Sequence, residues 1–185
     1  MELSLSEIIE LDEERSYEAC RDWLPELVQL LPSVAAIEVE HREQRDAGPE
    51  VVNRWRIMDP VPRAMRPYLP DPAIFVEQAR WNDAERSVAW ELDLEALPGV
   101  VAFRGLTQFR PGPHPASTEL LLAGSVAVDL SAIQSMPRVL QGLAPAAERF
   151  VLDHVRSDLT VLCRSLARYL ADDAEQAPPQ PAVKP

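Results

Sequence analysis

Residues 137–170 read PRVLQGLAPAAERFVLDHVRSDLTVLCRSLARYL and carry the strongest periodic signal in the chain. Their apolar positions recur every three or four residues, at Leu140, Leu143, Ala147, Val151, Val155, Leu159, Leu162, Leu166 and Leu170. This spacing predicts a helix of about nine turns with one continuous apolar stripe. Pro145 can kink that helix or mark where its regular part begins. So long a stripe needs an equally long apolar surface to cover, and the preceding residues must supply it.

The preceding residues predict a β-sheet. Six segments alternate apolar and polar residues with the period of a strand, at 34–42, 51–58, 74–81, 87–94, 100–109 and 117–130. Residues 3–11 predict an earlier strand, and Asp12 is a suitable N-cap for a helix over 13–23. Pro25 suits the first turn of a second short helix over 25–31. The order strand, two short helices, six strands, long helix indicates an α+β fold with an antiparallel sheet.

Length and composition predict a single domain over residues 1–174. Residues 175–185 are rich in Pro, Gln and Ala and predict a disordered tail. No apolar run approaches the roughly 18 residues of a membrane span, so we expect no stable membrane insertion. The first 15 residues are acidic and predict no secretory signal.

The formal net charge of −12 argues against nucleic acid as a partner, because phosphate binding needs a basic face. It also argues against attraction to anionic membrane surfaces, which polybasic segments supply. Lys184 is the only lysine and lies in the predicted tail, so lysine-based catalysis is excluded from the folded part.

Cysteine and histidine positions predict neither a metal site nor a cofactor. Cys20 and Cys163 lie far apart, which speaks against a disulfide framework and a zinc site and fits a reducing cytoplasm. His41, His114 and His154 lack metal-ligand spacing. The sequence also contains no P-loop, nucleophile elbow or dinucleotide fingerprint.

Three local features carry a resemblance to a known family. They are the helix pair that ends in Leu31-Pro32-Ser33, the segment VVNRW at 51–55, and FRGLTQF at 103–109. With the order of elements, they make residues 1–174 similar to the START-like superfamily, also called SRPBCC or Bet v 1-like. The resemblance implies a helix-grip fold, in which a seven-stranded antiparallel sheet curves around a long C-terminal helix. It also implies a cavity for lipids, sterols, polyketides or other apolar molecules.

Seven residues are candidates for contact with such a ligand. His41, Asn53 and Thr107 share the inward parity of their strands, and His154 lies close to the helix stripe. These could hydrogen-bond a ligand, or they could satisfy buried backbone groups. The aromatic candidates could line a cavity or simply fill the core; they are Trp55, Trp90 and Phe103.

Residues 59–72 contain five prolines, so this segment cannot pair as a central strand. One interpretation is a lid over the cavity mouth, with Arg63 and Arg66 near an acidic ligand group. The other is a stiff loop that packs on the rim of the sheet.

Three functions remain open from the sequence. The first is binding of a hydrophobic small molecule between the long helix and the sheet. The second is a polyketide cyclase or dehydratase-like enzyme that uses His41 or His154 as general acid or base. The third is a protein-interaction module whose interior is filled by its own side chains.

Overall fold

The computed structural model describes residues 1–58 and 62–176, and its elements follow the predicted order. After β1 (Glu2–Ile9) come α1 (Glu13–Asp22) and the 3-10 helix η1 (Glu26–Leu30). Asp12 caps α1, because its carboxylate accepts a hydrogen bond from the Arg15 N–H at 3.0 Å. The remaining elements are β2 (Val34–Gln44), β3 (Pro49–Ile57), η2 (Arg66–Tyr68), β4 (Ala73–Asn82), β5 (Ser87–Leu94), β6 (Val101–Pro111), β7 (Thr118–Val128), η3 (Leu130–Ala132), α2 (Arg138–Gln141) and α3 (Ala144–Gln176).

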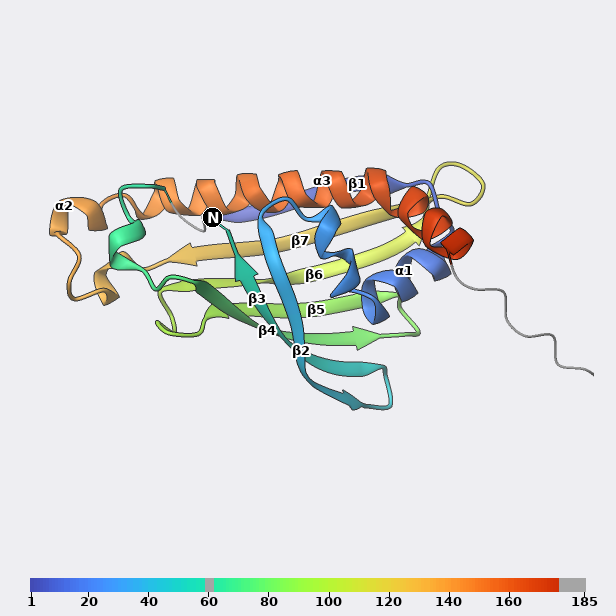
Figure 1. Cartoon of the computed structure of the whole chain (residues 1–185), viewed down its shortest axis with the longest axis horizontal. Coiled ribbons are helices and arrows are strands. Elements are labelled where there is room, and N and C mark those ends of the chain that lie inside the picture. The colour runs from blue at the N-terminus through green and yellow to red at the C-terminus, as the bar shows by residue number, and fades with distance from the viewer. Residues whose placement is uncertain (59–61, 177–185) are drawn as a thin grey trace, which may run out of the picture.

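The seven strands form one antiparallel sheet in the order β1-β7-β6-β5-β4-β3-β2. The six later strands follow one another as hairpins, and β1 joins the far edge beside β7. The sheet twists strongly, so that β6 and β7 run almost along α3 whereas β2 and β3 cross it steeply (Figure 1). The α+β prediction with a seven-stranded antiparallel sheet is confirmed.

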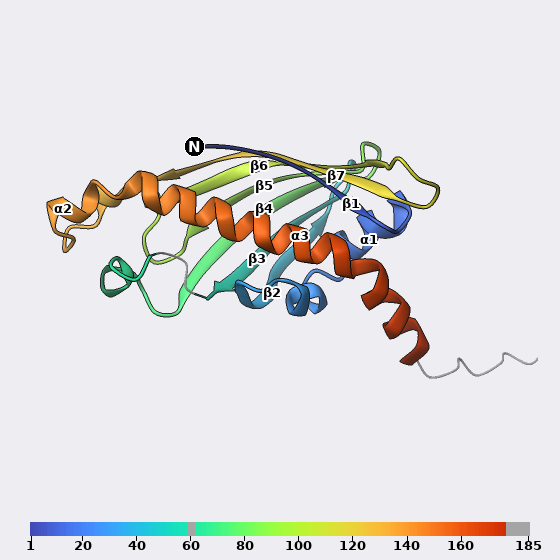
Figure 2. The same ribbon diagram turned by 90° about the horizontal axis from the view of Figure 1, so that it is seen from above.

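The long helix α3 lies across one face of this sheet (Figure 2). It packs against β1 and β7 on one side and against η1 on the other. From Ala147 onward the apolar stripe faces the interior, although Val151 and Val155 are only half-buried. Within the described ranges 1–58 and 62–176, no helix is long and apolar enough to cross a membrane.

The start of the predicted helix is wrong. Residues 138–141 form the separate short helix α2, and α3 begins only at Ala144. Pro145 is its second residue, where a missing N–H breaks no helical hydrogen bond, so the proline marks the beginning of the regular helix. Leu143 lies between the two helices and is 38% exposed, outside the buried stripe.

A bulge in β2 overturns the predicted inward orientation of His41. The register shifts between Val39, which lies opposite Asn53, and His41, which lies opposite Val52. The extra residue reverses the alternation, so His41 is exposed on the outer face. The same shift brings Arg42 to the inner face.

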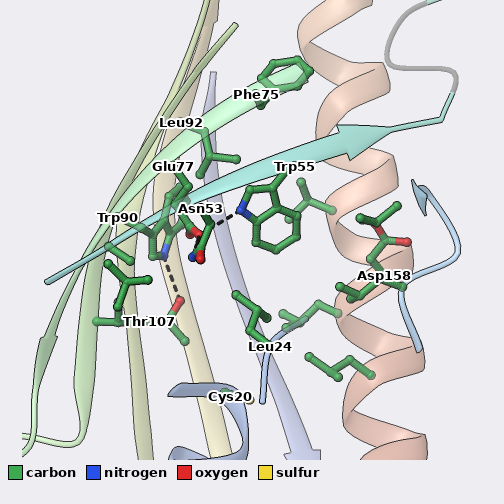
Figure 3. A pocket seen from close by; sticks show the side chains of 18 of the residues that line it. Cys20, Leu24, Asn53, Trp55, Phe75, Glu77, Trp90, Leu92, Thr107 and Asp158 are labelled. Atoms are coloured by element: carbon green, nitrogen blue, oxygen red, sulfur yellow. Dashed lines mark hydrogen bonds between the residues drawn. The ribbon is translucent and has the colours of Figure 1, made fainter. Parts of the chain in front are cut away.

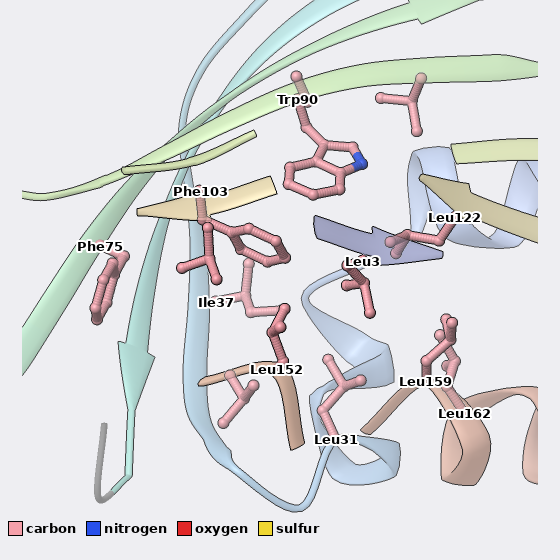
Figure 4. Close-up of a cluster of buried hydrophobic side chains, with 14 of the residues drawn as sticks. Leu3, Leu31, Ile37, Phe75, Trp90, Phe103, Leu122, Leu152, Leu159 and Leu162 are labelled. Atoms are coloured by element: carbon pink, nitrogen blue, oxygen red, sulfur yellow. The ribbon is translucent and has the colours of Figure 1, made fainter. Parts of the chain in front are cut away.

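The core joins the inner face of the sheet to α3 (Figure 4). Trp90 and Phe103 meet edge to face with ring centroids 4.6 Å apart. Gly105 and Gly124 lie opposite each other beneath the Trp90 ring. A Cβ atom at Gly105 would lie 2.5 Å from Trp90 Cζ2 and 2.5 Å from the Ala123 carbonyl oxygen, so this glycine makes room for the indole.

Two predicted segments lie partly outside the described residues. Of the predicted lid, residues 59–61 are not described, while Met65 is fully buried and Arg63 is exposed. The lid therefore stays a prediction. Helix α3 continues to Gln176, into the predicted tail, and residues 177–185 lie outside the described part.

Candidate functional site

A cavity of about 270 Å³ lies between α3, the inner face of the sheet and the segment joining α1 to η1 (Figure 3). Its volume is just below the range of about 300–1,000 Å³ that is typical of small-molecule sites. The sheet and α3 supply a mostly apolar wall, which includes Phe75, Trp90, Leu92, Phe103, Val151, Val155, Leu159 and Leu162.

One polar cluster interrupts this wall. Glu77 of β4 is 8% exposed and accepts two hydrogen bonds at the same oxygen, Oε2. Asn53 donates one from Nδ2 at 2.8 Å, and Trp55 donates the other from Nε1 at 2.9 Å. Burial raises the pKa of Glu77 above its ordinary value, while these two hydrogen bonds act in the opposite direction. The cluster holds a carboxyl group in surroundings where its charged form is costly.

A second polar pair is satisfied within the protein. Trp90 Nε1 donates to Thr107 Oγ1 at 3.0 Å, and both side chains are buried. This bond fixes the indole ring that forms part of the wall.

Two polar residues of α3 line the cavity and also make internal contacts. His154 Nδ1 lies 2.9 Å from the Phe150 carbonyl oxygen, and the ring centroids of His154 and Phe150 are 4.2 Å apart. Asp158 accepts hydrogen bonds from the Ser33 backbone N–H at 3.0 Å and from the Ser33 hydroxyl. Asp158 thus ties α3 to the segment just before β2, which is a structural role.

Charged residues of α1 and β2 lie in the cavity wall. Arg42 of β2 pairs with Asp22 at the end of α1, and Arg21 pairs with both Asp22 and Asp83 at 2.7 Å. Arg21, Asp22 and Arg42 line the cavity and remain partly exposed. These three residues form a charged part of the cavity wall where α1 and β2 meet, and we call them the rim.

The structure brings six of the seven predicted site residues to the cavity wall, whereas His41 lies outside it. The six are Asn53, Trp55, Trp90, Phe103, Thr107 and His154. Whether they contact a ligand stays a prediction. Sequence analysis missed Glu77, because β4 has apolar residues on both parities. Phe75 and Trp81, which share the parity of Glu77, were the signal that could have placed it inside.

Among the side chains that the structure describes, in residues 1–58 and 62–172, no group of three or more His, Cys, Asp or Glu is placed to hold a metal ion.

No family model and no curated protein sequence matches the chain. Solved structures do. Protein TTHA0849 from Thermus thermophilus superposes with a TM-score of 0.65 at 20% identity, over 93% of this chain and 99% of that one. For the Zhui aromatase/cyclase from a Streptomyces species the TM-score is 0.62 at 11% identity, over 97% of this chain and 96% of that one. For a START superfamily protein from Mycobacterium smegmatis it is 0.56 at 16% identity, with coverages of 89% and 98%.

These likenesses cover nearly the whole of each chain, and at such low identity they bear on architecture alone. The architecture of this chain is a seven-stranded antiparallel sheet with two short helices after β1 and the long helix α3. The chain therefore has the START-like, or helix-grip, fold.

Proposed function

We propose that the protein binds an apolar small molecule in the cavity between α3 and the sheet. The observation that carries this proposal is the hollow of about 270 Å³ with a mostly apolar wall. Helix α3 rests on β1 and β7 at one side and on η1 at the other, so it bridges the middle of the sheet. Burying apolar ligand surface there would contribute about 25 cal/mol per Å² before the costs of association.

Two observations favour binding over the other functions. An interaction module with a filled interior is disfavoured by the hollow itself. A histidine-based cyclase loses one of its two candidate residues, because His41 lies on the outer face, and the contact of His154 Nδ1 with the Phe150 carbonyl oxygen leaves Nε2 as the only nitrogen of that ring for proton transfer.

A substitution that fills the cavity tests the proposal. Val155 is half-buried on α3 and lines the hollow, so Val155→Trp would place an indole in the ligand space. We expect wild type to bind the probe 2-methylnaphthalene, and Val155→Trp to bind it at least about tenfold more weakly, the equivalent of about 1.4 kcal/mol. Isothermal titration calorimetry measures both affinities.

Val139→Trp is the matched control, because Val139 is 80% exposed on α2 and is not one of the residues that line the cavity. Urea unfolding of each variant verifies that it is folded. Equal affinity of wild type and folded Val155→Trp would contradict the proposal.

A further inference from the structure

Glu77 is a buried carboxyl group without an ion-pair partner among the residues that the structure describes. It comes from the inner face of β4 and is surrounded by the apolar cavity wall. Its two protein donors, Asn53 Nδ2 and Trp55 Nε1, both bind Oε2. In the described part of the chain nothing donates to Oε1, and because Glu77 lines the cavity, a ligand can reach this oxygen.

The cluster contains a second acceptor that is not used. Asn53 Oδ1 is buried and has no hydrogen-bond partner within the described residues. The indole N–H groups of Trp55 and Trp90 already donate hydrogen bonds within the protein, to Glu77 and to Thr107 respectively. A buried polar atom left without a partner costs about 1–3 kcal/mol, so the cluster favours the arrival of another hydrogen-bond donor.

This inference rests on the proposed function: we infer that the apolar ligand carries a hydroxyl group, which donates a hydrogen bond to Oε1 of Glu77. Three alternatives fit the cavity less well. A carboxylate would place a second negative charge beside Glu77. A carbonyl offers no donor to Glu77 Oε1 or to Asn53 Oδ1. An ammonium group would have to lose its hydration in a mostly apolar cavity, at a cost of several kcal/mol.

A hydroxyl at this point also agrees with the electrostatics of Glu77. Burial raises the pKa of Glu77, and a third donor would stabilise the charged form as Asn53 and Trp55 already do. Hydrogen bonds to charged groups are about twice as strong as neutral ones, so the hydroxyl gives selectivity as well as orientation.

Four naphthalene probes of similar shape test this inference by calorimetry on the wild-type protein. They are 2-methylnaphthalene, 2-naphthol, 2-naphthoate and 2-(aminomethyl)naphthalene. We expect 2-naphthol to bind at least about tenfold more tightly than 2-methylnaphthalene, and 2-naphthoate to bind more weakly than either. Equal affinities of 2-naphthol and 2-methylnaphthalene would overturn the inference, as would a preference for 2-naphthoate or for the amine.

Glu77→Gln keeps the shape of the side chain and an acceptor oxygen but removes the charge. We expect it to lower the ratio of 2-naphthol to 2-methylnaphthalene affinity by roughly threefold or more. Glu91→Gln is the control, because Glu91 is an exposed residue on the neighbouring strand and should leave the ratio unaltered. An unaltered ratio in folded Glu77→Gln would also overturn the inference.

The proposed function and this inference fail in different ways. If both neutral probes bind equally and Val155→Trp excludes both, the cavity binds apolar molecules and only the hydroxyl assignment is wrong. If neither neutral probe binds wild type, the proposed function itself fails.

Discussion

The buried carboxyl group of Glu77 makes stability depend on pH in a defined direction. Burial raises its pKa in the folded protein, whereas a glutamate in the unfolded chain titrates near about 4.3. As pH rises above that value, the unfolded chain loses its proton first, so the folded state binds more protons. Stability therefore falls with rising pH until the folded carboxyl has also ionised.

We predict that Glu77→Gln removes this fall in stability at rising pH. The free energy of unfolding of Glu77→Gln, relative to wild type, should increase as pH rises from about 4.5 and level off above the folded pKa. Each unit of pKa elevation adds about 1.36 kcal/mol to the difference. Urea unfolding of both proteins across this range measures it, with Glu91→Gln as the exposed control; a difference that stays constant with pH would contradict the prediction.

Among the elements, α1 and β2 meet at the rim, and their ion pairs would affect the exchange of a ligand that enters and leaves there. Arg42 reaches the inner side of β2 because of the bulge, and there it pairs with Asp22 at the end of α1. Both side chains are partly exposed, so the pair stabilises the closed rim by at most about 1 kcal/mol.

We predict that Arg42→Met accelerates release of a bound probe while changing global stability by less than about 1 kcal/mol. Loss of about 1 kcal/mol from the closed rim corresponds to roughly fivefold faster release. Stopped-flow fluorescence of 2-naphthol release measures the rate.

Arg45→Met is the matched control for this rate. Arg45 makes exposed ion pairs with Glu43 and Glu50 in the β2–β3 hairpin and does not line the cavity. Equal release rates from wild type and Arg42→Met would mean that exchange occurs elsewhere.

The elements also show where the sequence pattern was sufficient to predict the bounds and the inward side of a strand or helix. Strand β5 has the predicted bounds, Ser87–Leu94, because Val88, Trp90 and Leu94 alternate without competition. In β2 the apolar pattern gives no sign of the bulge after Val39. The prediction that His41 points inward is wrong for this reason. The long helix was predicted through Gly142 and Leu143 because apolar spacing continues across a break that Pro145 marks.

The packing of α3 on the sheet is a property of the whole molecule that local sequence patterns do not determine. The stripe on α3 predicted a helix laid on a sheet, and the structure has that arrangement. Whether the two surfaces touch or leave a hollow depends on the twist of the sheet and on the long-range contacts of α3 with β1, β7 and η1. The inward parity of Glu77 could be taken from Phe75 and Trp81, but its place beside a hollow follows from the same assembly and could not be derived from periodicity.

The net charge of the whole chain makes its stability depend on salt concentration. The 30 acidic residues outnumber the 18 basic ones, and the net charge is −12 at pH 7. The excess negative charges repel one another most strongly in the compact folded state. Exposed ion pairs such as Arg80–Glu91 contribute little in the opposite direction.

We therefore predict that NaCl stabilises the protein at neutral pH. Raising the salt from about 0.01 M to about 0.15 M shortens the screening length from about 30 Å to about 8 Å, which weakens repulsion across the molecule. The free energy of unfolding in urea should rise over this range at pH 7. Near the isoelectric point of about 4.7 the net charge vanishes, so the increase should vanish or reverse as salt then only weakens ion pairs. The same increase at both pH values would show that salt acts through something other than net charge.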